Sequence, residues 1–437
     1  MQQNITLENG CVKKLFFKFA IPSILGMLIV SLQMIVDGMF LSKGVGSIGL
    51  AAVNLSMPLI NTLLSVSLMI CVGGSVLVGI ASGNKDYSKA DGLTTLTLIL
   101  LFSVLLSLSI IILLNFKFIT NLLGVNKEIY PFVKNYLSIL VAGSVFFNMP
   151  IFTETFIRIA GKPNQVFISG LVCFTVNVFL DFIFIIKLGM GMEGAAIATC
   201  FANMLGALTL IPNIKFGKLV GSLSDIKDIF YNGSSEMLTT ISSAITTFVF
   251  NIIVMKNIGI LGVSALSIVF YVNSIVNISL YGLSQALQPI ISYNLGAKRI
   301  DKIKDVLKIS LKSGAAIGII TFIAMQIFGE SLINLFSNGD KKLASLTKDV
   351  VFFFTFTYLL SFINIISSSF HTSIEKPFES AFISCGRSII FVMIPLFSLP
   401  IILGDVGIWL ATPIAELLCL GVSIPMMIKS LKKLPLN

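Results

Sequence analysis

Residues 19–42 read FAIPSILGMLIVSLQMIVDGMFLS, an apolar run whose only charged residue is Asp37. The run is long enough to form a helix that crosses the roughly 30 Å hydrocarbon core of a bilayer. A charge near the middle of a membrane costs at least about 2.5–3.5 kcal/mol on insertion scales, and such residues usually carry ions, protons or charged substrates. Asp37 therefore indicates transport across a membrane.

The composition of the whole chain agrees with a membrane protein. Hydrophobic residues make up 56% of the 437 residues, charged residues make up 11%, and the mean hydropathy is +0.98. A water-soluble protein of this size could not keep its surface polar with so few charges. The net charge of +10 does not indicate nucleic-acid binding, because Lys and Arg are scattered over short loops and form no basic stripe.

Apolar runs separated by Gly, Pro, Asn and charged loops predict an all-α membrane protein with twelve transmembrane helices. The expected spans are 14–41, 51–81, 91–116, 129–158, 164–187, 192–214, 228–256, 262–292, 306–328, 347–373, 377–403 and 406–429. An even number of spans puts both termini on one side, and the loops of that side carry roughly twice as many Lys and Arg as the opposite loops. We therefore expect both termini in the cytoplasm.

The two halves of the chain resemble each other. Gly49-Leu-Ala-Ala-Val53 matches Gly262-Val-Ser-Ala-Leu266 at an offset of 213, and the Lys-Pro turns at 162–163 and 376–377 match at an offset of 214. Six helices per repeat gives two pseudo-symmetric bundles of the same orientation, which we expect to enclose a central cavity. The predicted organisation is an N-terminal lobe over 1–214, a cytoplasmic linker over 215–227 and a C-terminal lobe over 228–437.

Asn177 and Asp181 are four residues apart, so both side chains project from one face of a helix. An amide oxygen one turn from a carboxylate suits a dehydrated cation or a carboxyl group that is stabilised in both protonation states. A buried hydrogen bond without a role in transport is the alternative for this pair.

Three further acids and one arginine lie in or near predicted spans. Glu154 precedes Arg158 by four residues, so a structural ion pair is as reasonable as a functional role. Glu236 follows Gly233-Ser-Ser near the expected start of a helix, where it could complement the helix dipole. Glu416 lies near Pro413, and Arg387 has no acid at a close helical spacing, so its partner must come from another helix.

The chain is rich in Phe and Met, with 36 and 16 residues. Such side chains line adaptable cavities for lipophilic substrates, and aromatic walls favour organic cations, although single residues of these types more often face lipid. The candidate cavity residues include Glu236. The others are chosen for their closeness to the acids along the chain, and they are Met27, Met34, Phe146, Met149, Phe152 and Phe174.

Several catalytic and metal motifs are missing from the sequence. It contains no GxxxxGK[ST] phosphate loop, no HExxH and no GxSxG, so neither ATP hydrolysis nor another hydrolytic reaction is indicated. The six cysteines have no CxxC spacing, and the single histidine excludes a multi-histidine zinc site. We expect no enzyme activity and no resident cofactor.

Dispersed motifs in a consistent order resemble the multidrug and toxic compound extrusion (MATE) family over nearly the whole chain. They are NVFLD at 177–181, GMGMEGAAIAT at 189–199, GLAAV at 49–53, QPIISYNLGA at 288–297 and GIWLATPIAE at 407–416, with Pro22 and Asp37 in the first helix. The GSSE segment at 233–236 resembles the MepA-like branch. The sequence departs from the family at Ser234, where many members carry Pro.

The resemblance implies an exporter that exchanges H⁺ or Na⁺ for drug-like organic cations. The family's cation site falls here on Asp37, Asn177, Asp181 and Thr199, which would be the ligands of Na⁺. The polar position of the fourth helix falls on Glu154. The acid that another branch carries in the tenth helix is missing, so no cation site is expected in the C-terminal lobe.

The sequence thus predicts a cation-coupled antiporter in the cytoplasmic membrane of a prokaryote. We expect it to act as a monomer on small organic cations, with the lipid bilayer around it and no nucleic-acid partner. Three alternatives stay open. The first is a flippase for lipid-linked precursors, which would need a cationic cavity; the second is a narrow metabolite exporter. The third is a membrane enzyme or sensor, for which no catalytic constellation is present.

Overall fold

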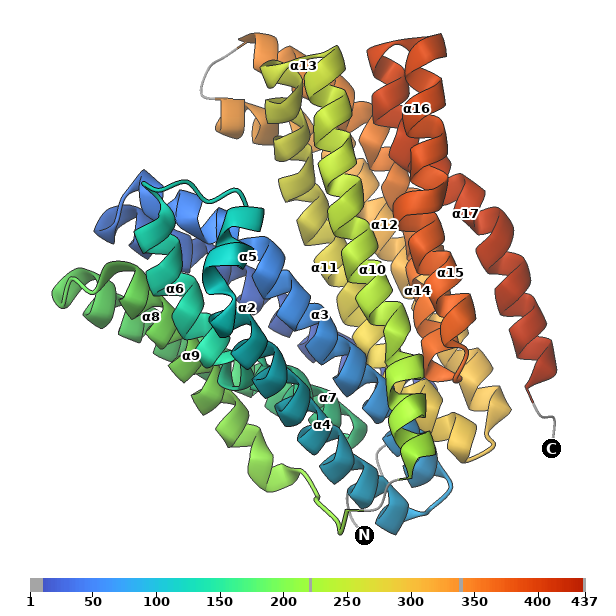
Figure 1. Cartoon of the computed structure of the whole chain (residues 1–437). Coiled ribbons are helices and arrows are strands. Elements are labelled where there is room, and N and C mark those ends of the chain that lie inside the picture. The colour runs from blue at the N-terminus through green and yellow to red at the C-terminus, as the bar shows by residue number, and fades with distance from the viewer. Residues whose placement is uncertain (1–10, 220–221, 338–340, 435–437) are drawn as a thin grey trace. The chain divides into compact units, whose positions relative to one another are not determined.

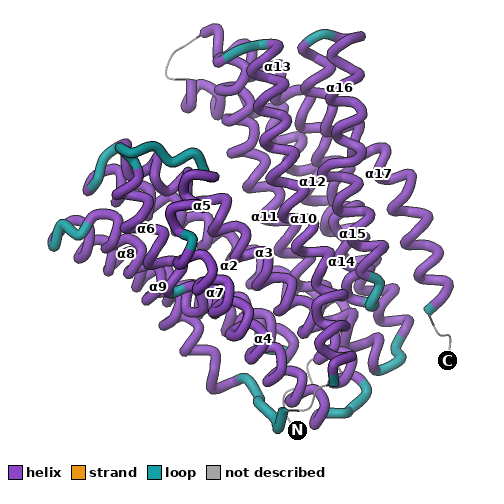
Figure 2. The backbone as a smooth tube through the Cα atoms, in the orientation of Figure 1, coloured by secondary structure: helices purple, strands orange, loops and turns teal. Residues whose placement is uncertain are grey.

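The computed structural model describes residues 11–219, 222–337 and 341–434, and its regular structure there is entirely helical (Figure 2). The helices form two compact units, Ile21–Gly233 and Cys11–Ala20 with Ser234–Asn437. The first unit holds α2 (Val12–Gly44) from Ile21 onward, α3 (Ser47–Gly83), α4 (Tyr87–Leu114), α5 (Phe116–Leu122), α6 (Tyr130–Ala142), α7 (Ser144–Ile159), α8 (Pro163–Asp181), the π-helical turn η1 (Phe182–Lys187), α9 (Gly191–Leu210) and the 3₁₀ turn η2 (Ile211–Asn213). The expectation of an all-α protein is confirmed.

The second unit begins within the helix that follows the linker. Figure 1 labels the helices of both units along the chain. Its elements are α10 (Leu223–Asn257) from Ser234 onward, α11 (Ile260–Gly296), α12 (Ile300–Ser337), α13 (Lys341–Phe354), η3 (Thr355–Thr357), α14 (Tyr358–Ser373), α15 (Pro377–Cys385), the π-helical turn η4 (Gly386–Ile390), α16 (Phe391–Leu403) and α17 (Asp405–Lys433).

These elements follow the twelve expected spans. Among the described residues, ten helical segments are long and apolar enough to cross a membrane, and α6 with α7, which meet at a bend of 51°, make an eleventh when the bent pair is counted as one span. The bend falls at Gly143, where an added Cβ would meet the Cys200 sulfur and the Ile139 carbonyl. The remaining expected span, 262–292, lies within α11.

The backbone of the two repeats turns at equivalent positions. Positive φ angles occur at Gly46 and Gly259 (89° and 83°) and at Lys85 and Lys298 (63° and 57°), each pair 213 residues apart. Gly161 and Glu375 (79° and 57°) form a further pair at an offset of 214. Left-handed backbone is rare outside glycine, so its recurrence at Lys85 and Lys298 is strong evidence for the predicted repeat.

Helices of the first unit pack through an apolar core and face outward with apolar side chains. Leu101 and Leu105 of α4 are fully buried, whereas Leu106 and Ile110 on its other face are about half exposed, as expected for a helix in contact with lipid. Small polar residues join the helices: the Ser109 hydroxyl donates to the Val141 carbonyl at 2.7 Å. Such bonds let helices of a membrane bundle approach closely.

Candidate functional site

Two carboxyl groups meet in the first unit. Asp37 lies on α2 and is partly exposed, whereas Asp181 is the last residue of α8 and is only 1% exposed. The carboxyl groups of Asp37 and Asp181 lie close enough to interact directly with each other. Two ionised carboxylates this close repel each other, so a proton or another cation bound between them would relieve the repulsion.

A local change in helix geometry sets the position of Asp181. The α-helix α8 ends at Asp181, and the next residues, Phe182–Lys187, form the π-helical turn η1. The wider turn redirects the chain toward α9, which packs along α8. Single π-helical turns inside membrane helices frequently accompany functional sites.

Asn177 adds an amide one turn before Asp181. Its side chain is fully buried, and among the described residues neither its Oδ1 nor its Nδ2 has a hydrogen-bond partner. The Oδ1 atoms of Asp37 and Asp181 are likewise buried without a partner in the described part of the chain. A buried polar group without a partner costs about 1–3 kcal/mol, so four such atoms at one place indicate a site that binds something other than protein.

Thr199 lies on α9. Its hydroxyl donates to the Ala195 carbonyl at 2.9 Å, so its proton is used within its own helix and its oxygen lone pairs stay available to a cation. Carboxylate, amide and hydroxyl oxygens together are a donor set that suits Na⁺ as well as a proton. The chemistry of these side chains therefore suits either coupling ion, although the described contacts of Thr199 join it only to its own helix.

Glu154 forms the ion pair that its spacing predicts. The Arg158 guanidinium donates to Glu154 Oε2 at 3.1 Å on α7. Both side chains are largely buried, with 26% and 10% exposure. Arg158 therefore compensates the charge of Glu154, whereas no ion pair is formed by Asp37 or Asp181 among the described residues.

A group of neighbouring polar residues escaped the sequence reasoning. The Cys173 sulfur donates to Asn203 Oδ1 at 3.0 Å and lies 3.8 Å from Gln33 Oε1, and Asn203 Nδ2 donates to the Phe147 carbonyl at 2.9 Å. Tyr136 of α6 is close enough to both aspartates to interact with them electrostatically. The available signal was spacing, because Gln33 precedes Asp37 by four residues and Asn203 follows Thr199 by four.

The second unit contains a polar cluster of a different kind. Arg387 donates to Glu416 Oε1 from Nε at 3.0 Å and from a terminal nitrogen at 2.6 Å, and Asn364 Nδ2 donates to Glu416 Oε2 at 2.7 Å. Ser423 completes the cluster by donating to Asn364 Oδ1 at 2.5 Å. Arg387 thus finds its partner on another helix, as its sequence required, and both oxygens of Glu416 are hydrogen-bonded.

The interpretation of Glu236 as a dipole-complementing acid is wrong. The helix α10 begins at Leu223, so Glu236 lies several turns inside it, whereas the effect of a helix dipole falls off within the first turn. Glu236 instead accepts a hydrogen bond from Gln288 Nε2 of α11 at 3.3 Å.

The candidate cavity residues lie in different environments. Met34 and Phe146 are exposed, at 60% and 48%, and Phe152 is fully buried against Phe156 with ring centroids 4.4 Å apart. The half-buried members are Met27, Met149 and Phe174. Phe152 is therefore part of the core of the first unit in this structure.

Comparisons with known proteins agree with one another. A model of the MatE family matches residues 22–183 and 237–402. The multidrug export protein MepA of Staphylococcus haemolyticus is 23% identical over 429 residues, which cover 96% of this chain and 94% of that protein. A multidrug resistance MATE transporter in an outward-facing conformation superposes with a TM-score of 0.93, 20% identity and 99% of both chains covered. A MOP-superfamily transporter from Pyrococcus furiosus, described as having a binding pocket of reverse polarity, gives a TM-score of 0.92, 20% identity and coverage of 100% and 99%.

Proposed function

The chain belongs to the MatE family of multidrug and toxic compound extrusion transporters, and we propose that it exchanges H⁺ or Na⁺ for drug-like organic cations. The observation that carries this proposal is the close pair of carboxyl groups of Asp37 and Asp181, each of which has a buried oxygen without a hydrogen-bond partner in the described part of the chain. Two acids without a cationic partner inside a membrane protein favour a cation as the ligand.

Each residue has a distinct task in this proposal. Asp37 and Asp181 take up the proton or coordinate Na⁺ through their carboxylates. Asn177 and Thr199 supply neutral oxygens that replace water around the ion. Glu154, already paired with Arg158 at 3.1 Å, contributes to the field around the site without binding the ion itself.

The exchange follows from charge and from two states of the protein. An ion that binds the acids lowers their negative charge and with it their attraction for a cationic substrate. Inward ion movement drives outward substrate movement if the ion and the substrate favour different states. One charge that crosses 100 mV supplies about 2.3 kcal/mol, close to a fifty-fold concentration ratio, before any chemical gradient is counted.

The proposal also covers the membrane in which the protein lies, its orientation and its oligomeric state. The chain is a multi-span membrane protein, and we place it in the cytoplasmic membrane of a prokaryote with both termini in the cytoplasm. It would act as a monomer without a resident cofactor, and its cargo would be small organic cations rather than nucleic acid.

A flippase for lipid-linked precursors is the weaker candidate, because such anionic cargo needs uncompensated cations. The two arginines of the helix interiors are each paired with an acid, Arg158 with Glu154 and Arg387 with Glu416. Because each guanidinium is already paired with a carboxylate, neither arginine offers a free positive charge to an anionic headgroup.

Ethidium efflux from proteoliposomes tests the proposal. A pH gradient and a Na⁺ gradient are imposed separately on the parent protein, Asp37→Asn and Asp181→Asn, with Asp301→Asn at the exposed start of α12 as the matched control. We expect efflux under one gradient, its loss in both site variants and no change in the control. Normal efflux by both folded site variants would overturn the proposal, and no efflux by the folded parent would favour a narrow exporter or the flippase.

A further inference from the structure

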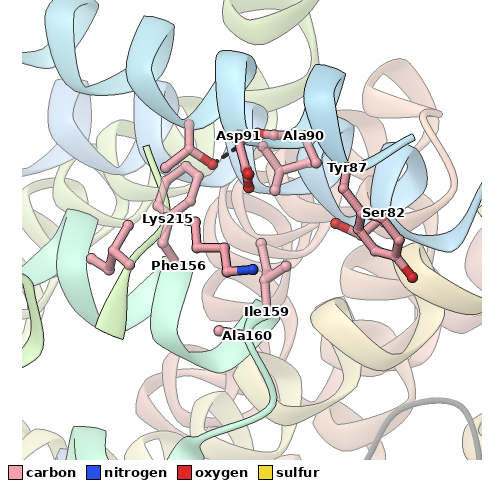
Figure 3. A pocket seen from close by; sticks show the side chains of 11 residues that line it. Ser82, Tyr87, Ala90, Asp91, Phe156, Ile159, Ala160 and Lys215 are labelled. Atoms are coloured by element: carbon pink, nitrogen blue, oxygen red, sulfur yellow. Dashed lines mark hydrogen bonds between the residues drawn. The ribbon is translucent and has the colours of Figure 1, made fainter. Parts of the chain in front are cut away.

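A cavity of about 160 Å³ lies in the first unit, at the end where the linker leaves α9 (Figure 3). It is separate from the aspartate pair. Buried apolar side chains, among them Val78, Phe156 and Ile159, form its floor. Polar side chains at its rim come from the start of α4 and from the linker.

Two opposite charges face this cavity without forming a direct ion pair. Asp91 of α4 and Lys215 of the linker both line it, and Figure 3 shows the carboxylate and the ammonium directed into the same space. The two groups interact electrostatically, yet their charged atoms are not within the 4.0 Å of an ion pair. Lys215 is exposed, and an ion pair at an exposed position gains little free energy, so both charged groups stay available to a ligand.

Hydrogen bonds fix the linker on both sides of Lys215. Before Lys215, Asn213 Oδ1 accepts a hydrogen bond from Lys162 Nζ at 2.7 Å. After it, Gly217 N donates to the Asp91 carbonyl at 3.1 Å, and the Thr95 hydroxyl donates to the Gly217 carbonyl at 3.0 Å. An added Cβ at Gly217 would meet Asp91 Cβ and the Gly92 nitrogen, so the close approach requires glycine.

An aromatic contact fixes the residue between these anchors. The ring of Phe216 stacks on that of Phe152 with centroids 6.4 Å apart and an interplanar angle of 11°. The backbone on both sides of Lys215 is therefore held beside the start of α4, whereas the exposed side chain of Lys215 is free to reach into the cavity. Hydroxyl groups of Ser82, Tyr87 and Thr94 complete the polar part of the lining.

We propose that this cavity binds a small zwitterion with an ammonium group and a phosphate. Asp91 would accept hydrogen bonds from the ammonium group, and Lys215 with the Tyr87 hydroxyl would bind the phosphate. An apolar cavity of about 150 Å³ holds benzene, so this volume suits a group of about eight non-hydrogen atoms, such as phosphoethanolamine. The same chemistry exists as a free metabolite and as the headgroup of a phospholipid.

Such a ligand would connect α4 to the linker that leads into α10. α4 itself already contacts α10, because Lys89 Nζ of α4 lies 3.9 Å from Asp225 Oδ1 near the start of α10. Occupancy of the cavity would therefore hold the linker against the first unit. This inference goes beyond the proposed antiport and does not depend on it.

Calorimetric titration of the purified full-length protein with phosphoethanolamine tests the free source. We expect binding about tenfold or more tighter than that of inorganic phosphate or ethanolamine, each of which satisfies only one charge. Asp91→Asn and Lys215→Gln should each weaken binding by a similar factor, whereas Lys218→Gln, on the exposed linker outside the cavity, should not. The exchanged variant Asp91→Lys with Lys215→Asp should restore binding, since a zwitterion can reverse its orientation.

Native mass spectrometry after reconstitution in mixed phosphatidylethanolamine and phosphatidylcholine tests the lipid source. Preferential retention of phosphatidylethanolamine, lost in Lys215→Gln, supports the headgroup, because the methylated ammonium of choline cannot donate hydrogen bonds to Asp91. The proposal is overturned if neither source binds to folded protein, or if binding is equal in Lys215→Gln and Lys218→Gln. Thermal unfolding of each variant shows that it is folded, and neither readout requires transport.

Discussion

Arg387 and Glu416 form a buried ion pair at a position where the first repeat carries a neutral contact. By the repeat offsets of 214 and 213 residues, Arg387 corresponds to Cys173 and Glu416 to Asn203. The Cys173 sulfur donates to Asn203 Oδ1 at 3.0 Å, and Arg387 donates to Glu416 Oε1 at 2.6 Å. The repeats therefore keep one interhelical contact and differ in its charge.

The first prediction concerns the stability that depends on this pair. Glu416→Gln or Arg387→Met leaves one buried charge without its partner, and breaking a buried pair in this way costs about 3–5 kcal/mol. The double variant should lose less than either single variant, because neither charge remains. The unfolding temperatures of the two single variants and the double variant, measured in detergent, test this prediction.

The exposed ion pair of Lys348 and Glu330 is the matched control. Its nitrogen and oxygen are 2.9 Å apart, but both side chains are more than 60% exposed. Surface pairs contribute little, so Glu330→Gln should leave the unfolding temperature nearly unchanged. Equal losses in Glu416→Gln and Glu330→Gln would contradict the structural role of the buried pair.

The second prediction is that the coupling ion stabilises the folded protein through the aspartate pair. A ligand that binds only the folded state raises the free energy of unfolding by about 1.4 kcal/mol at ten times its dissociation constant. Added Na⁺ or a lowered pH should therefore raise the unfolding temperature of the parent protein. Asp37→Asn and Asp181→Asn should remove this increase, and an undiminished increase in both variants would exclude the pair as the ion site.

The third prediction separates a structural from a coupling role of Glu154. Glu154→Gln leaves Arg158 buried without its partner and should lower the unfolding temperature, whereas Glu154→Gln with Arg158→Gln removes both charges and should recover part of the loss. We expect the double variant to retain ion-coupled efflux of ethidium, because Asp37 and Asp181 remain. Loss of efflux in a stable double variant would show that Glu154 takes part in coupling.

Much of this arrangement was predictable because bilayer helices have long apolar segments. The shared face of Asn177 and Asp181 followed from their spacing, and the pairing of Glu154 with Arg158 from theirs. The π-helical turn after Asp181 was not predictable, because hydropathy carries no information on hydrogen-bond register. The meeting of Asp37 with Asp181, and of Arg387 with Glu416, depends on which helices are neighbours. The error at Glu236 arose because charged and polar residues from Leu223 onward were read as linker, although they form the first turns of α10.

The last prediction concerns a close approach of two helix backbones in the first unit. An added Cβ at Gly73 of α3 would collide with the Ile229 carbonyl of α10, and one at Gly233 would collide with the Met69 carbonyl of α3. Backbone atoms cannot move aside as a side chain can, so Gly73→Ala and Gly233→Ala should each separate the helices and destabilise the protein by about 1–3 kcal/mol.

Gly170 of α8 is the matched control, since its added Cβ would meet no atom within 4 Å. Gly170→Ala should be neutral or stabilising by up to about 1 kcal/mol, because alanine favours helix more than glycine does. Unfolding temperatures of the three variants decide the matter, and a Gly73→Ala protein as stable as Gly170→Ala would show that α3 and α10 do not pack this closely.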